Sequence, residues 1–222
     1  MEKKSIIHQN SVIFHAFIKY RSAFSSSALS TPKVLASQSP RRKMLLQGLG
    51  IDFEAKSSPA DETFPAELSY KKVAEYIALQ KARSFPKNEL PEHFILITAD
   101  TVVCLNTEIL GKPKDETDAI AMLRKLSGKK HEVITGVVIT TAATQTAFSV
   151  KTEVYFKDLT ESEIAYYVEN YRPFDKAGAY GIQEWIGYVG ITRIDGSFFN
   201  VMGLPVQRVY EELCKMGYYK SA

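Results

Sequence analysis

Residues 34–50 read VLASQSPRRKMLLQGLG and combine side chains that are well suited to hold a phosphate group. Their hydroxyl and guanidinium donors are Ser37, Ser39, Arg41 and Arg42. The stretch predicts a short strand, a tight loop and a helix that starts at Pro40, with Ser39 as its N-cap. Arginine pairs with phosphate oxygens through two hydrogen bonds, and the N–H groups and dipole of a helix N-terminus attract anions. We therefore interpret the stretch as a phosphate-binding loop; the alternative is an ordinary capped helix with a solvated arginine pair.

Asp100 is a lone carboxylate inside the apolar stretch FILITADTVVCL, residues 94–105. Burying a carboxylate is costly unless it is paired, hydrogen-bonded or bound to a metal. Asp100 is therefore either a functional group or a residue in a bulge or turn between two strands. A second carboxylate, Glu62, follows Asp61 in the polar segment SSPADETFP. It could bind a divalent cation, because hard cations take carboxylate oxygens; the alternative is an ordinary acidic turn.

Two lysines lie where an ammonium group could meet a phosphate. Lys81 follows Val73 and Ile77 at helical spacing on a predicted helix over 69–85, so it shares their apolar face. Its side chain either extends to solvent or points its ammonium into a pocket. Lys112 follows a glycine and could approach a phosphate closely; the alternative is a surface loop lysine. In a glycine-rich segment further on, Gln183 could hydrogen-bond a ring through its side-chain carbonyl and its side-chain N–H groups.

Composition excludes several classes of protein. The chain has 222 residues, of which 45% are hydrophobic, enough for one α/β domain or two small lobes around a cleft. A net charge of +3 argues against a dedicated nucleic-acid binder. No apolar run approaches the roughly 20 residues that span a membrane. The two cysteines, Cys104 and Cys214, lie far apart and fit a reducing compartment, so we expect a cytoplasmic protein.

Residues 1–33 differ from the rest of the chain. They are rich in serine, lysine and histidine, and Glu2 is their only acid. We expect a disordered extension or an upstream start codon there; the alternative is an organelle transit peptide. Residues 34–222 are then expected to form a single domain, with two lobes around a cleft.

The remaining pattern predicts alternating strands and helices. Strands are expected at 34–36, 51–54, 94–105, 131–141 and 147–158, and helices at 40–50, 69–85, 115–126, 160–170 and 204–216. This order predicts an α/β fold with a mixed, twisted β-sheet flanked by helices. The segment Thr160-Glu161-Ser162-Glu163 is a capping box, so its glutamates have a structural role. His131, at the start of a predicted strand, is interpreted as a surface or edge histidine.

These residues together resemble the motifs of the Maf-like nucleoside triphosphate pyrophosphatases. The matching stretches, in chain order, are Ser37-Gln38-Ser39-Pro40-Arg41-Arg42, Asp61-Glu62-Thr63, Lys81-Ala82-Arg83, Ala99-Asp100-Thr101, Gly111-Lys112-Pro113, His131-x-Val133-x-Thr135, the run from Ala177 to Gln183, and Gly203-Leu204-Pro205. Each motif alone is weak, but their joint order covers about residues 34–213. The combination of Arg41, Thr101 and Gln183 resembles the dTTP/UTP pyrophosphatase subgroup. The subgroup that acts on 7-methyl-GTP typically has a tryptophan after the proline.

The resemblance implies hydrolysis between the α- and β-phosphates of a nucleoside triphosphate, which yields a monophosphate and pyrophosphate. It also implies an elongated fold with a central cleft, a divalent cation (Mg²⁺ or Mn²⁺) and frequently a homodimer, with neither nucleic acid nor membrane as a partner. Our hypothesis assigns substrate binding to Ser37, Ser39, Arg41, Thr101, Thr135 and Gln183, catalysis to Asp100, Lys81, Lys112 and Arg42, and the metal to Glu62 and Asp100. Among these residues, Gln183, Thr101 and Arg41 are expected to set the choice of base.

A second hypothesis is a non-catalytic, nucleotide-binding regulator of septum formation and cell division, a process to which the resembled family is linked. The same basic loop would serve such a sensor. The carboxylates Glu62 and Asp100 would be unnecessary in it, so their presence favours an enzyme. A third hypothesis keeps the chemistry and changes the substrate to a modified or purine triphosphate.

Overall fold

The computed structural model describes residues 31–218. Residues 1–30, most of the predicted extension, and residues 219–222 lie outside the described part of the chain. Within it the strands form one 7-stranded mixed sheet, in the order β2-β1-β3-β5-β6-β7, with β4 paired to β3. These strands are β1 (Lys33–Ala36), β2 (Glu54–Lys56), β3 (Ile95–Leu105), β4 (Glu108–Leu110), β5 (Lys130–Thr140), β6 (Gln145–Phe156) and β7 (Ile191–Asp195).

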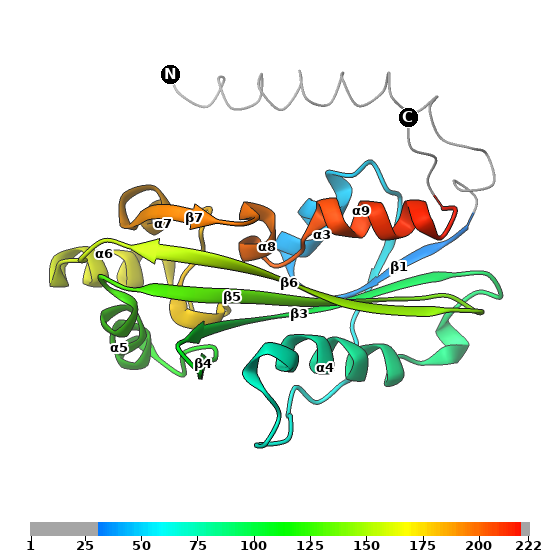
Figure 1. The fold of residues 1–222 in the computed structure, drawn as a ribbon, viewed down its shortest axis with the longest axis horizontal. Helices are drawn as coiled ribbons and strands as arrows, with labels where there is room; N and C mark the ends of the chain where they lie inside the picture. The colour runs from blue at the N-terminus through cyan, green and yellow to red at the C-terminus, as the bar shows by residue number, and fades with distance from the viewer. Residues whose placement is uncertain (1–30, 219–222) are drawn as a thin grey trace.

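Helices cover both faces of this sheet (Figure 1). They are α3 (Pro40–Gln47), α4 (Tyr70–Arg83), α5 (Glu116–Leu126), α6 (Glu161–Tyr171), α7 (Trp185–Gly190), α8 (Phe198–Met202) and α9 (Val206–Lys215), with two short 3₁₀ turns, η2 (Lys87–Glu89) and η3 (Ala177–Ala179). Helix α4 lies along one face, whereas α3, α8 and α9 lie along the other, and α5 and α6 gather at one end (Figure 1). The predicted α/β fold with a mixed, helix-flanked sheet is thus confirmed.

One edge of strand β3 is unpaired over its middle residues, and this gap in the strand pairing determines where a site can form. On that edge β3 pairs in parallel with β1 at Ile95–Ile97 and antiparallel with β4 at Val103–Leu105. The residues between these two pairings, 98–102, have no strand beside them on that edge. On the other edge β5 pairs continuously with β3, and Asp100 lies opposite Gly136. A crevice where neighbouring strands diverge is a common place for a ligand.

Asp100 lies in the middle of one continuous strand, so the alternative of a bulge or turn there is wrong. Successive side chains of a strand point to opposite faces. Thr98 and Asp100 therefore face α4, where the hydroxyl of Thr98 donates to the carbonyl of Ala78 at 2.7 Å. Thr101 faces the layer of α3 and α8. Because the edge is open between β1 and β4, groups from both faces can reach the same crevice.

Helix α4 approaches the sheet closely at Gly136 of β5. A Cβ atom added there would lie 2.3 Å from the backbone nitrogen of Glu75, so only glycine fits under the helix. The apolar face of α4 is buried at Val73, Ala74, Ile77 and Ala78. Lys81 continues the same face one turn after Ile77, so the close approach carries its side chain down to the level of Asp100.

Several helices begin where the sequence predicts, whereas one predicted strand does not form at its expected residues. Ser39 caps α3 as predicted, and Thr160 caps α6 in the predicted capping box with Glu163. The strand predicted at 51–54 is wrong, because β2 begins at Glu54, where parallel pairing with β1 starts. Residue Ile51 instead packs into the core.

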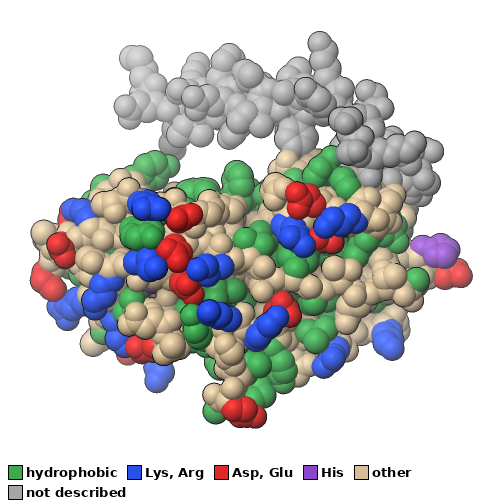
Figure 2. Space-filling view, viewed as in Figure 1, with side chains coloured by type: hydrophobic (Ala, Val, Ile, Leu, Met, Phe, Trp, Pro, Cys, Tyr) green, Lys and Arg blue, Asp and Glu red, His purple; other side chains and the backbone are tan. Residues whose placement is uncertain are grey.

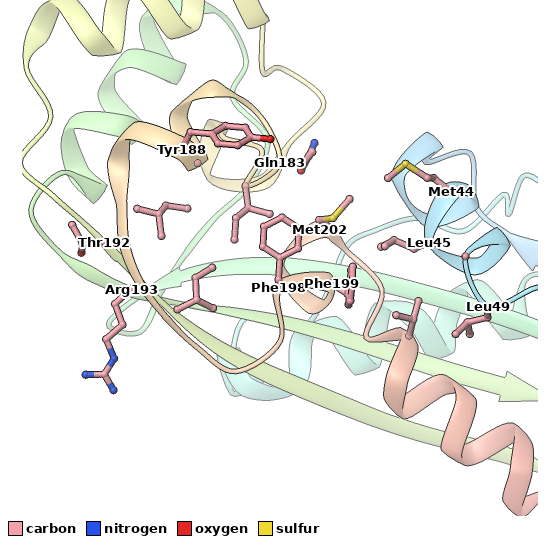
Figure 3. Close-up of a pocket in the computed structure, with 16 residues that line it drawn as sticks. Met44, Leu45, Leu49, Gln183, Tyr188, Thr192, Arg193, Phe198, Phe199 and Met202 are labelled. Carbon is pink, nitrogen blue, oxygen red and sulfur yellow. The ribbon is translucent and has the colours of Figure 1, made fainter. Parts of the chain in front are cut away.

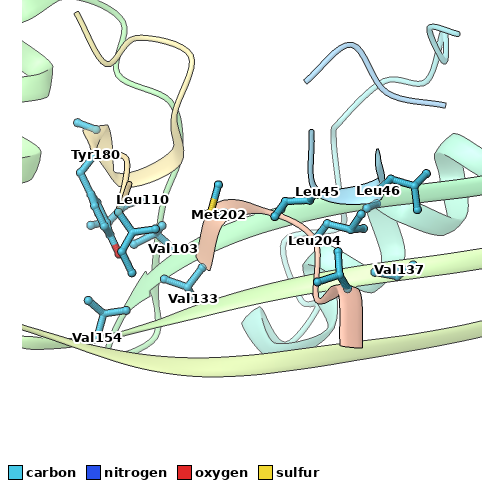
Figure 4. Close-up of a cluster of buried hydrophobic side chains, with 14 of the residues drawn as sticks. Leu45, Leu46, Val103, Leu110, Val133, Val137, Val154, Tyr180, Met202 and Leu204 are labelled. Carbon is cyan, nitrogen blue, oxygen red and sulfur yellow. The ribbon is translucent and has the colours of Figure 1, made fainter. Parts of the chain in front are cut away.

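The main core lies under α3, α8 and α9. Figure 4 shows its side chains in two groups along the strands: Tyr180, Leu110, Val103 and Val154 at one end, and Leu45, Leu46, Leu204 and Val137 at the other. Met202 and Val133 lie between the two groups (Figure 4). A second, smaller cluster packs beneath α4. None of the helices in residues 31–218 is long and apolar enough to cross a membrane.

Candidate active site

A cavity of about 410 Å³ opens at the gap between β1 and β4. Most of the residues singled out from the sequence line it: Ser37, Ser39, Arg41, Arg42, Glu62, Lys81, Asp100, Thr101, Lys112 and Gln183. They come from the loop after β1, the first turn of α3, the end of α4, the middle of β3 and three loops. Thr135 is the exception, because it is fully buried behind Thr101 and does not line the cavity.

Lys81 joins the two predicted metal ligands. Its ammonium Nζ lies 2.7 Å from Glu62 Oε1 and 2.7 Å from Asp100 Oδ1. The side chains of Lys81 and Asp100 are only 10% and 12% exposed, so this pair is nearly desolvated. Of the two possibilities for Lys81, the structure has the ammonium in the cavity. Burial alone would raise the pKa of Glu62, but the hydrogen bonds and charges of Lys81 and Lys112 hold that pKa below its usual range.

Arg42 is held in place by a chain of hydrogen bonds that runs into the core. Its Nε donates to the carbonyl of Gly203 at 2.8 Å, and its Nη2 donates to Thr101 Oγ1 at 3.0 Å. Thr101 Oγ1 lies 3.0 Å from Thr135 Oγ1, and Thr135 donates to the carbonyl of Asn200 at 2.9 Å. Thr135 thus supports Thr101 and Arg42 from behind the wall of the cavity. From the sequence, Thr135 is expected to contact the substrate, but its side chain lies one layer behind the cavity and contacts Thr101 instead.

The serine loop is ordered by its own hydroxyls. Ser39 Oγ accepts from the N–H of Arg42 at 3.4 Å, and Ser37 Oγ accepts from the N–H of Ser39 at 3.2 Å. Each hydroxyl acts as an acceptor in these bonds, so its own proton stays available to an oxygen of a ligand. The loop therefore offers two O–H donors beside the guanidinium groups of Arg41 and Arg42.

Asp175 and Lys176 also line the cavity, and the sequence analysis missed both. Asp175 Oδ2 lies 2.8 Å from Arg41 Nη1, and Asp175 Oδ1 lies 2.6 Å from Lys176 Nζ. Burial would raise the pKa of Asp175, but the hydrogen bonds from Lys176 and Arg41 hold it below its usual range. The one signal for them in the sequence is a pair of opposite charges directly before the glycine-rich run that carries Gln183.

The charges of the lining side chains favour an anion. Five cationic residues and three acidic residues line the cavity, which leaves a net charge of +2. The cations are Arg41, Arg42, Lys81, Lys112 and Lys176, and the acids are Glu62, Asp100 and Asp175. On the face of the molecule in Figure 2, by contrast, lysine and arginine side chains lie among aspartate and glutamate side chains.

A larger, mainly apolar cavity of about 880 Å³ adjoins the first and shares Gln183 and Met202 with it. Figure 3 shows Met44, Leu45 and Leu49 on one side of this apolar cavity and Tyr188 on the other, with Phe198, Phe199 and Met202 between them. Gln183 lies at its border with the active-site cavity. Its Oε1 is buried and has no hydrogen-bond partner among the described residues, so it is free to receive a donor from a ligand.

The two predicted metal ligands fit a cation that is held together with its substrate. No group of three or more His, Cys, Asp or Glu side chains within residues 31–218 is arranged to hold a metal ion. Glu62 and Asp100 do converge, since both contact the same ammonium. Two carboxylates match Mg²⁺, which keeps several waters and shares its remaining ligands with substrate phosphates. We find the donor set sufficient for such a shared ion and insufficient for a metal bound by protein alone.

His131 is not the surface or edge histidine expected from the sequence. It is 1% exposed, and its Nε2 lies 2.7 Å from the hydroxyl of Tyr180, which lines the cavity. The expectation is wrong because β5 lies between β3 and β6, and therefore in the interior of the sheet. Phe156 and Tyr180 pack edge-on against the imidazole ring.

Burial of His131 makes stability depend on pH. It lowers the pKa of His131 from 6.5 to about 4. Between these values the unfolded chain takes up a proton that the folded chain does not, so the free energy of unfolding falls as the pH falls from about 6.5 towards 4. We expect His131→Gln to lose less stability than the wild type between about pH 7 and pH 5 in urea unfolding. The matched control is His93→Gln, at an exposed histidine. Equal losses in the wild type and His131→Gln would contradict this account.

Comparisons with known proteins agree on one family. Residues 32–216 match the family model described as "Maf-like protein". The chain is 54% identical over 184 residues to the dTTP/UTP pyrophosphatase of Phocaeicola vulgatus, which covers 82% of this chain and 95% of the relative. It is 53% identical over 186 residues to the dTTP/UTP pyrophosphatase of Porphyromonas gingivalis W83, a match that covers 83% of this chain and 94% of the relative. It is 48% identical over 183 residues to the dTTP/UTP pyrophosphatase of Christiangramia forsetii, a match that covers 82% of this chain and 93% of the relative.

Proposed function

The chain belongs to the Maf-like family, and from this premise we propose that it hydrolyses dTTP and UTP to the nucleoside monophosphate and pyrophosphate. The relatives of that name, at about half identity, support this substrate choice. The observation that carries the proposal is the arrangement of Asp100, Lys81 and Glu62 in the middle of a cavity whose lining has a net positive charge. The role it implies is the removal of unwanted nucleotides from the pool, and modified pyrimidine triphosphates are further substrates to test.

The triphosphate is held by the cations and donors of the loop and its neighbours. Arg42 and Arg41 present guanidinium groups at the start of α3, and the hydroxyls of Ser37 and Ser39 lie beside them. A triphosphate carries about four negative charges and keeps about two when it binds a divalent cation. The net charge of +2 on the lining matches the metal-bound form. In this proposal Lys112 takes a phosphate oxygen, since its side chain is 57% exposed and only loosely paired with Glu62, at 3.4 Å.

Asp100 is the group that orients the attacking water and accepts its proton. Lys81 fixes one carboxylate oxygen of Asp100 and leaves the other available. The ammonium of Lys81, 2.7 Å away, gives that carboxylate a counter-charge and holds it in place for this role. Lys81 also lies close enough to the phosphates to offset charge that develops in the transition state.

Glu62 and Asp100 would hold the divalent cation, Mg²⁺ or Mn²⁺, together with the phosphates. When bound, it would supply Lewis-acid polarisation of a phosphoryl oxygen. Glu62 is the more exposed of the two carboxylates, at 49%, and it stays anionic because Lys81 and Lys112 lower its pKa. Glu62 is thus ready to bind a cation without losing a proton.

Gln183 reads the base in this proposal, with Thr101 and Arg41 around it. Its unpartnered Oε1 can accept the N3–H of uracil or thymine, and its amide N–H can donate to a ring carbonyl. In a pose that sets ring N3 against Oε1, cytosine has no N3–H and offers that oxygen no donor. A buried polar group without a partner disfavours the wrong ligand.

Replacing Gln183 by alanine tests this assignment. We expect the ratio of kcat/KM for UTP over CTP to fall by about tenfold, with a smaller change in kcat for UTP itself. The ratio is measured by steady-state kinetics on both nucleotides. Gln207→Ala, on the exposed side of α9, is the control. An unchanged ratio in Gln183→Ala would remove it from base selection.

The function as a whole is tested by a nucleotide panel. The full chain is incubated with each common ribo- and deoxyribonucleoside triphosphate in the presence of Mg²⁺ or Mn²⁺, and released pyrophosphate is measured. Preferential turnover of dTTP and UTP supports the proposal. Turnover of other nucleotides would discard the base assignment, and tight binding without any turnover would favour a non-catalytic regulator of cell division.

We also propose a cytoplasmic homodimer. The free thiols of Cys104 and Cys214 suit a reducing compartment. Exposed aromatic side chains at the apolar cavity, Tyr188 at 82% and Phe199 at 48%, are consistent with a surface covered by a second copy. Light scattering on the full chain would measure the mass, and a monomer would contradict this part.

A further inference from the structure

Tyr167 and Glu184 form a buried pair behind the wall of the active-site cavity. Tyr167, on α6, is fully buried, and the side chain of Glu184 is 19% exposed. The Tyr167 hydroxyl donates to Glu184 Oε2 and accepts from the N–H of Gly181 at 3.0 Å. Neither residue lines the active-site cavity or the apolar cavity.

The segment that carries Gln183 is fixed on both sides by this single hydroxyl. Gly181 precedes Gln183 and is held through its N–H, whereas Glu184 follows Gln183 and is held through its carboxylate. The N–H of Glu184 also donates to the carbonyl of Gly181 at 3.0 Å, which closes a tight turn with Gln183 inside it. The position of the Gln183 amide therefore depends on contacts made outside the cavity.

The other oxygen of Glu184 holds a cation of the cavity wall. Glu184 Oε1 lies 3.1 Å from Lys176 Nζ, and Lys176 also contacts Asp175, which contacts Arg41. The side chain of Lys176 is only 10% exposed. Glu184 thus connects Gln183 to the charged side of the cavity through groups that have little freedom to move.

We propose that Tyr167 and Glu184 are positioning residues for base selection, which they control through the turn that carries Gln183. This rests on the proposed function, because it takes Gln183 as the group that contacts the base. Burial and the bond to Glu184 raise the pKa of Tyr167, so the hydroxyl stays a donor at every working pH. Removing it leaves the N–H of Gly181 without its partner and lets the turn relax.

The test is Tyr167→Phe, which removes the hydroxyl and keeps the ring. We expect the UTP over CTP ratio of kcat/KM to fall by about fivefold, mainly through a higher KM for UTP. Tyr171→Phe is the matched control, because its ring stacks on Tyr167 at 5.0 Å and its hydroxyl has no hydrogen bond within residues 31–218. This control should keep the wild-type ratio.

A double-mutant cycle separates this inference from the proposed function. In the Gln183→Ala background, Tyr167→Phe should have no further effect on the ratio, because the two changes act on one element. If Gln183→Ala lowers the ratio and Tyr167→Phe does not, the positioning role is overturned while the proposed function stands. If Gln183→Ala itself leaves the ratio unchanged, the assignment of Gln183 to the base and the positioning role both fail, whereas hydrolysis of dTTP and UTP is judged by the nucleotide panel.

Glu184 provides a second variant with its own readout. Glu184→Gln keeps an acceptor oxygen for Tyr167 and should retain most of the ratio, whereas Glu184→Ala should lose it to about the same extent as Tyr167→Phe. Thermal unfolding is measured on each variant. Equal ratios in Glu184→Ala and the wild type, or a loss of rate equal for UTP and CTP, would assign the pair a structural role only.

Discussion

Asp100→Asn is expected to lower kcat for UTP by about two to four orders of magnitude, the range that positioned acid–base groups contribute. Asparagine has the size of aspartate and still offers an oxygen to the ammonium of Lys81, so the site keeps its geometry. It cannot take a proton from water. We expect KM to change little, because the phosphate-binding cations remain, and kcat and KM are measured on purified variants.

Asp195→Asn is the control for this result, since Asp195 is an exposed aspartate at the end of β7, away from the cavity. It should have wild-type kcat. Thermal unfolding of Asp100→Asn should show a folded protein. A folded variant with near-normal kcat would remove Asp100 from the mechanism.

Lys81→Met is expected to abolish activity and to lower the free energy of unfolding by about 3 kcal/mol at neutral pH. Methionine fills similar space, but the nearly buried carboxylate of Asp100 loses its counter-charge, as does Glu62. Steady-state kinetics and urea unfolding at neutral pH measure the two effects.

Lys112→Met is the matched control for stability. Lys112 also contacts Glu62, but at 3.4 Å and with a side chain that is 57% exposed, so its loss should change stability by less than about 1 kcal/mol. We expect it to raise KM instead. Equal stability of the two lysine variants would contradict the assignment of Lys81 as the central cation of the site.

Local patterns predicted the elements that hold the site. Ser39 and Pro40 set the start of α3, and the spacing of Val73, Ile77 and Lys81 predicted that the lysine shares the buried face of α4. Asp100 stood out because a carboxylate in an apolar strand needs a partner. In each of these cases the residues that carry the prediction lie within one or two helical turns or within one strand.

Contacts between distant segments could not be predicted in this way. That Lys81 meets Asp100 depends on the glycine at 136, which lets α4 lie directly on β5. That His131 is buried depends on β6 covering the far edge of β5. The pairs made by Asp175 with Arg41 and by Tyr167 with Glu184 join segments that lie far apart in the sequence or on separate elements. The spacing of apolar residues within a helix or strand does not predict such contacts.

The measurement that tests the central claim most directly is the identity of the products from UTP. The full chain is incubated with UTP and a divalent cation, and the phosphorus NMR spectrum is followed over time. The account predicts that UMP and pyrophosphate appear together in equal amounts, and that with Asp100→Asn both form about two to four orders of magnitude more slowly. Release of UDP and inorganic phosphate would contradict cleavage between the α- and β-phosphates, and an unchanged UTP spectrum would contradict the assignment as an enzyme.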